Sequence, residues 1–175
     1  MAHPAAESRR MNNPNSTKVN FRPLIAAGTL LGIGMGGFVD GIVFHQILQL
    51  HNMLSAKLPP NTVPNLEINM VWDGLFHAFT WLMTALGIAM LWRVGGKPEV
   101  PHSTRTLLGS LIQGWGIFNL VEGIIDHHLL HLHHVVERLG VSVADWIFLA
   151  SGVVFILLGQ ALIRGARGNA PADHS

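Results

Sequence analysis

The stretch VADWIFLASGVVFILLGQALI, residues Val143–Ile163, is apolar along almost its whole length. It matches the roughly 20 residues that a helix needs to cross the hydrocarbon core of a bilayer. A helix of a soluble bundle would present a polar face to water, and this stretch has almost none. The sequence therefore predicts a transmembrane helix here.

Three more apolar runs of spanning length precede it, at Leu24–Phe44, Met70–Trp92 and Leu107–Ile125. Charged residues make up 12% of the chain, against about 25% in soluble domains. The alternative, an all-α soluble bundle, would need polar faces on these runs. We predict an all-α fold, a transmembrane four-helix bundle whose first partner is the lipid bilayer.

Composition also limits the chemistry. The net charge of +1 gives no indication of nucleic-acid binding. The chain has no cysteine, which excludes disulfides, iron–sulfur clusters and thiolate metal sites. A bound metal would therefore use His, Asp, Glu or Met, and the methionines are scattered over apolar faces as packing residues.

The predicted domains are a disordered cytoplasmic tail over 1–21, a four-helix transmembrane domain over 22–166, and a C-terminal tail over 167–175. The first apolar run is longer than the 7–15 residues of a signal-peptide core, so we expect it to stay as an anchor. Basic residues gather before the first run, between the second and third, and after the fourth. The positive-inside rule then places both termini in the cytoplasm.

Two segments of the chain resemble each other. Asp40-Gly-Ile-Val-Phe-His45 aligns with Glu122-Gly-Ile-Ile-Asp-His127, and each precedes a second apolar run that begins near an aspartate. The sequence thus predicts two parallel two-helix repeats, 22–95 and 104–166, related by an axis along the membrane normal. Four polar pairs are present in both halves: Asp40/Glu122, His45/His127, His51/His133 and Asp73/Asp145.

The most unusual chemistry lies in Glu122–His134, which holds five of the eleven histidines. If this stretch is one helix, Glu122, Asp126 and His133 share one stripe, and His127, His131 and His134 share another. Imidazoles on one helix face can converge on a cation. The alternative is a solvated helix end at the membrane surface.

Asp73 and His77 are spaced i, i+4 and could supply an oxygen and a nitrogen to the same ion. The alternative for Asp73 is a helix N-cap, as for Asp145. Other polar residues are present in one half only, so the two halves are not equivalent. This asymmetry suggests a single dominant metal site, on the extracytoplasmic side. We predict a copper, iron or zinc ion with ligands from His45, Asp73, His77, Glu122, Asp126, His127, His131 and His134, supported by Asp40, His51, His128, His133 and Asp145.

The motifs Gly34–His45, Asp73–His77 and Glu122–His134 resemble those of a family of bacterial four-span predicted membrane proteins of unknown function. The resemblance covers Pro23 to Arg164 and implies the fold and the membrane location. It also implies a location in the bacterial inner membrane and a gene encoded near those of respiratory oxidases, so a respiratory membrane complex is a candidate partner, beside a homo-oligomer.

Three functions fit these patterns. The first is metal handling or assembly of a respiratory complex, for which metal should be lost with the histidines. The second is a metal-dependent membrane oxidoreductase acting on a hydrophobic substrate. Against it, His131-Leu-His-His lacks the His-x-x-His-His spacing of membrane desaturases. The third is an ion or proton relay, which the lack of ionisable residues in the inner halves of the spans disfavours.

Overall fold

The computed structural model describes residues 19–168 and contains only helices and their connections within that range. The four long helices are α2 (Arg22–Val39), α3 (Val63–Gly95), α4 (Thr104–Glu122) and α5 (Val143–Gly168). Two π-helical segments, η1 (Asp40–Ile47) and η2 (Gly123–Leu129), continue α2 and α4, and a short 3-10 turn η3 spans Glu137–Leu139. The predicted all-α four-helix fold is confirmed. The predicted tails lie largely outside the described residues.

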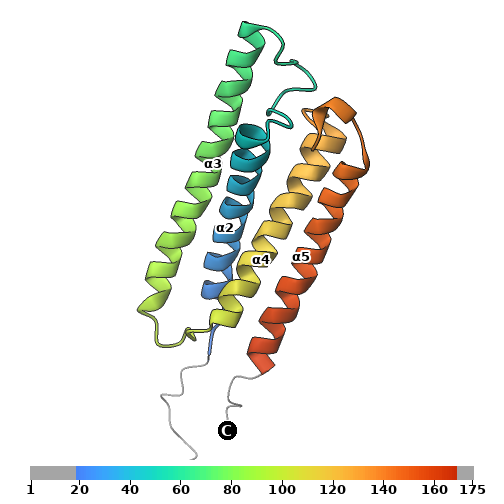
Figure 1. Cartoon of the computed structure of the whole chain (residues 1–175). Helices are drawn as coiled ribbons and strands as arrows, with labels where there is room; N and C mark the ends of the chain where they lie inside the picture. Colours follow the sequence, from blue (N-terminus) through green and yellow to red (C-terminus); the bar gives the residue numbers. More distant parts are fainter. Residues whose placement is uncertain (1–18, 169–175) are drawn as a thin grey trace, which may run out of the picture.

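The helices are arranged around a central pair, α2 and α4 (Figure 1). Helix α3 packs on α2 and helix α5 packs on α4, whereas α3 and α4 do not pack against each other. The two outer helices are therefore separated by the central pair, and each leaves a space beside the central helix that it does not touch.

All four helices are long and apolar enough to cross a membrane: Arg22–Ile47, Val63–Gly95, Thr104–Leu129 and Val143–Gly168. Helix α3 begins earlier than its apolar run, because the Thr62 hydroxyl accepts the Asn65 amide at 3.4 Å and caps the helix. The residues between Thr62 and the apolar run are thus already helical. Asp73 lies inside α3, so the alternative that it caps a helix is wrong.

The central pair owes its close approach to glycine. A Cβ added to Gly32 would overlap the backbone of Leu111, and one added to Gly114 would overlap the carbonyl of Thr29. Small residues at such positions let membrane helices pack backbone to backbone. The contact holds α2 and α4 side by side, and so brings η1 and η2 together at one end of the bundle.

Both central helices widen into π-helix at a carboxylate, at Asp40 and directly after Glu122. Each then ends alike, with a left-handed residue, Gln49 at φ 49° and His131 at φ 47°. The assumption that Glu122–His134 is one helix is wrong, because η2 ends at Leu129. The two helix faces predicted for this stretch therefore end at Leu129. The last three histidines, His131, His133 and His134, lie in the α4–α5 connection.

We expect Gly114→Leu to destabilise the bundle by about 3 kcal/mol, the upper range for overpacking a tight contact. The matched control is Gly74→Leu, because a Cβ at Gly74 would meet nothing within 4 Å. The measurement is unfolding of the purified protein in mixed micelles, followed by circular dichroism. Equal stability of the two variants would contradict the proposed role of the glycine contact.

Candidate metal centre

Six polar side chains converge where η1, η2 and the two following connections meet. They are Asp40, His45 and His51 from the first half of the chain, and Glu122, His127 and His133 from the second. None is more than 4% exposed. Such a concentration of buried ionisable groups is costly unless each one has a partner.

Two of the imidazoles are oriented by carboxylates from the outer helices. His45 donates from Nδ1 to Oδ1 of Asp73 on α3 at 3.0 Å. Nδ1 of His127 lies 3.3 Å from Oδ1 of Asp145 on α5. A carboxylate behind an imidazole fixes the ring and increases its strength as a metal ligand through the other nitrogen.

The other two imidazoles are held by the connections, and each is held by the opposite half of the chain. His51 donates from Nδ1 to the carbonyl of Val135 at 3.0 Å, and His133 donates to the carbonyl of Met53 at 3.1 Å. A carbonyl only accepts, so the proton sits on Nδ1 and the lone pair on Nε2. The two rings stack with centroids 4.5 Å apart.

The Nε2 atoms face the two carboxylates without forming hydrogen bonds. Nε2 of His45 lies 3.0 Å from Oδ2 of Asp40, and Nε2 of His133 lies 3.6 Å from Oε1 of Glu122. Within residues 19–168, all four Nε2 atoms and both Glu122 oxygens are buried without a hydrogen-bond partner. Atoms this close that are not aligned as donor and acceptor have the arrangement expected of ligands to a common ion.

Three groups of ligand atoms lie within 4.8 Å of one another: His45/His51/His133, Glu122/His127/His133 and Asp40/His45/Glu122. His45, His133 and Glu122 each belong to two groups, so the cluster is continuous. Nitrogen and carboxylate ligands without sulfur suit iron, zinc and copper. The arrangement can hold a transition-metal ion, with enough ligands for more than one.

The outer carboxylates are themselves fixed by the connections. Asp73 accepts the Met53 amide at 2.8 Å and the Asn52 side chain at 2.8 Å, in addition to His45. Asp145 accepts the amides of Val135 and Ser142 at 3.0 and 2.9 Å. Each outer helix thus orients a histidine and also anchors the connection that supplies another.

His133, which lies in the α4–α5 connection, is kept neutral by its surroundings. Burial and the neighbouring histidines His51 and His127 hold the pKa of its imidazole well below the usual value. A neutral imidazole is the form that binds metal. Its environment therefore prepares this side chain as a ligand at neutral pH.

The structure leaves several predicted ligands outside the converging groups. His77 donates from Nδ1 to the backbone oxygen of Asp73 at 2.7 Å, so the two side chains do not share a site. His131 is exposed, and its ring centroid lies 5.8 Å from that of His134, whose Nδ1 is 3.6 Å from Oδ1 of Asp145.

Asp126 and His128 lie beside the cluster as well. Asp126 is half-buried and points into an adjacent cavity, and the ring of His128 packs on Trp146 with centroids 4.7 Å apart. Asp40, His51 and His133, predicted as supporting residues, contribute atoms to the converging groups. The signal that could have found them was their presence in both halves of the sequence.

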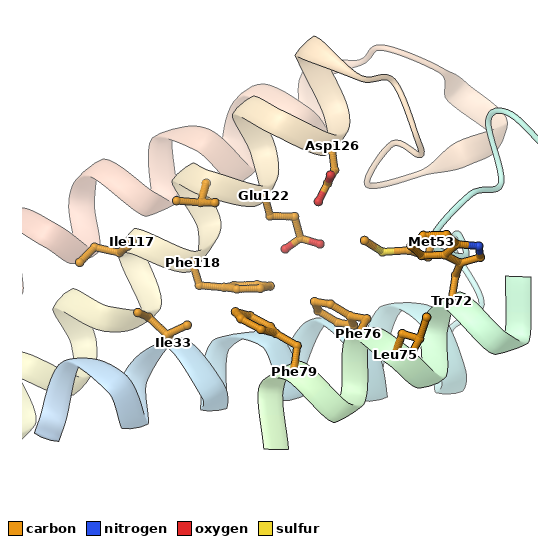
Figure 2. Close-up of a pocket in the computed structure, with 11 residues that line it drawn as sticks. Ile33, Met53, Trp72, Leu75, Phe76, Phe79, Ile117, Phe118, Glu122 and Asp126 are labelled. Atoms are coloured by element: carbon orange, nitrogen blue, oxygen red, sulfur yellow. The ribbon is translucent and has the colours of Figure 1, made fainter. Parts of the chain in front are cut away.

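An apolar cavity of about 470 Å³ reaches the cluster from the side. We call it the α3–α4 groove, because both helices line it (Figure 2). Its walls are aromatic and aliphatic, and its polar end consists of Glu122 and Asp126. The wall residues include Trp72, Leu75, Phe76, Phe79, Phe118 and Val121.

We expect Asp73→Ala to lower stability by about 2 kcal/mol, because it removes the acceptor of three donors, the buried His45 ring and the part-buried Asn52 side chain and Met53 amide. Hydrogen exchange of the Met53 amide should accelerate, since that amide donates to Asp73. The control is Glu67→Ala, an exposed carboxylate on the same helix. Unchanged protection of Met53 in Asp73→Ala would show that the carboxylate does not anchor the connection.

A family model described as "Predicted membrane protein (DUF2243)" matches residues 27–166. No curated protein and no solved structure matches the chain. The matched range contains all four long helices apart from their outermost residues, together with every side chain of the cluster. The chain belongs to the DUF2243 family of predicted membrane proteins.

Proposed function

We propose that the buried cluster is a resident transition-metal centre. One observation supports this most directly: four imidazoles have Nδ1 beside an oxygen and leave Nε2 without a partner, next to two buried carboxylates. Buried polar atoms in native proteins almost always have partners. A cation at this position would satisfy the Nε2 atoms and the carboxylates together.

Burial favours a bound cofactor over a transported ion. All six converging side chains are at most 4% exposed, and both connections close over them. A site that exchanges its ion readily would be expected to expose at least one ligand. Copper, iron and zinc remain the candidate ions on ligand chemistry.

A metal-dependent oxidoreductase acting on a hydrophobic substrate is the second candidate. The observation in its favour is the α3–α4 groove, which places an apolar cavity directly against Glu122. A role in assembling a respiratory complex, or in a homo-oligomer, stays a prediction from the sequence.

We also propose that the centre faces the extracytoplasmic side of the bacterial inner membrane. Support comes from the basic residues at the opposite end of the bundle, where α2 begins, α3 and α4 connect, and α5 ends. This orientation would place both termini in the cytoplasm. It would also give the centre access to metals outside the cell.

The two-helix repeat is a further proposal that the geometry supports. His45–Asp73 corresponds to His127–Asp145, and the bond from His51 to Val135 corresponds to that from His133 to Met53. The π-helical segments and left-handed residues match as well. A two-fold relation between the halves would explain why every ligand type occurs twice.

The test is the total metal content of protein purified without chelator, compared between His127→Ala and His131→Ala. Both histidines lie in the same stretch, but only His127 belongs to a converging group. We expect at least one copper, iron or zinc ion per chain in the unaltered protein and in His131→Ala. In His127→Ala we expect metal affinity to fall by about tenfold or more.

Circular dichroism and gel filtration check that both variants fold. If His131→Ala lost the metal and His127→Ala kept it, the result would contradict the converging groups and favour His131 as a ligand, as the sequence alone predicts. Absence of stoichiometric metal from the unaltered protein, even after incubation with each ion, would refute the proposed centre.

A further inference from the structure

The α3–α4 groove opens sideways, toward the position of the lipid. Helices α3 and α4 do not pack on each other, and the side chains along the opening are exposed, with Leu75 at 56% and Val121 at 51%. On a membrane-spanning helix such side chains face lipid tails. A hydrophobic molecule could therefore enter from the bilayer without passing through water.

The inner end of the groove carries a carboxylate without a hydrogen-bond partner. Glu122 is 4% exposed, and neither of its oxygens has a hydrogen-bond partner. Figure 2 shows Glu122 reaching into the groove, with Asp126 beside it. One ion at the centre accounts for Oε1, which lies 3.6 Å from His133 Nε2. The carboxylate then still has an acceptor free for a donor in the groove.

The residues next to Glu122 are aromatic. The rings of Phe76 and Phe118 lie 6.0 Å apart between centroids, and Phe79 lies beside them (Figure 2). Aromatic surfaces of this kind favour a flat ring in offset or edge contact. Among the residues that the structure describes, no lysine or arginine lines the groove, so an anionic head group would face two carboxylates without a counter-charge.

We propose that the α3–α4 groove binds a membrane-soluble molecule with an aromatic, hydroxyl-bearing head, such as a phenol or hydroquinone, on an apolar tail. The hydroxyl donates to Glu122, the ring packs on Phe76 and Phe118, and the tail leaves past Leu75 and Val121 into the bilayer. A volume of about 470 Å³ is within the range of sites for such molecules. This inference rests on the proposed function, because Glu122 belongs both to the centre and to the groove.

The test uses three probes with the same alkyl chain, brominated next to the head: an alkylphenol, its methyl ether, and an alkyltrimethylammonium. Binding of each probe to the protein in lipid nanodiscs is measured as the quenching, by bromine, of the fluorescence of Trp72, which lines the groove. The Trp72→Phe variant identifies the share of the signal that comes from this residue. Metal content is measured on the same samples, before and after chelator.

We expect the phenol to bind about tenfold more tightly than the ether, because only the phenol donates to the carboxylate. Val121→Phe fills the groove and should weaken phenol binding about tenfold while metal content stays the same. Val154→Phe is the matched control, since Val154 is 49% exposed on α5 and does not line the groove. It should change neither quantity.

Equal binding of phenol and ether, tighter binding of the ammonium probe, or full binding by Val121→Phe would each overturn the proposed ligand class. Stoichiometric metal in such a protein would leave the metal centre standing. Conversely, the protein could prefer the phenol, lose that preference in Val121→Phe, and never take up metal. That result would support the ligand site in the groove and overturn the metal centre.

Discussion

The bundle depends on how four imidazoles are held at Nδ1. An imidazole in an apolar interior can rotate, change tautomer or become protonated, and each of these changes would leave no lone pair facing the cluster. Here two carboxylates and two backbone carbonyls lie against the Nδ1 atoms. The proposed ligands are thereby oriented without an ion, and an ion would not have to order them.

That orientation depends on all four long helices and on the two connections at this end of the bundle. The glycine contact between Gly32 and Gly114 sets η1 beside η2, and the outer helices supply Asp73 and Asp145. The two connections exchange hydrogen bonds, because each one carries a histidine whose acceptor belongs to the other. Packing in the spans and chemistry at their ends are therefore parts of a single arrangement.

The spans could be predicted from the sequence because hydrophobic length is a strong local signal, and Val143–Ile163 has almost no polar face. The ligand set was harder to predict. Extending a regular helix to His134 ignored the π-helical segment and the left-handed residue at His131, which turn the chain back over the cluster. The pairs shared by both halves, such as His51 and His133, pointed to the converging residues more accurately than the histidine-rich stretch did.

The exchanged hydrogen bonds have a consequence for the timing of biogenesis. His51 is synthesised early, but the carbonyl that orients it belongs to Val135, and Asp145 follows later still at the start of the last helix. During insertion, the first helix pair alone has half of the ligands and none of the acceptors that the second half provides. If the cluster holds the proposed ion, its pocket is complete only after the fourth span has entered the bilayer, and loading would be the last event of maturation.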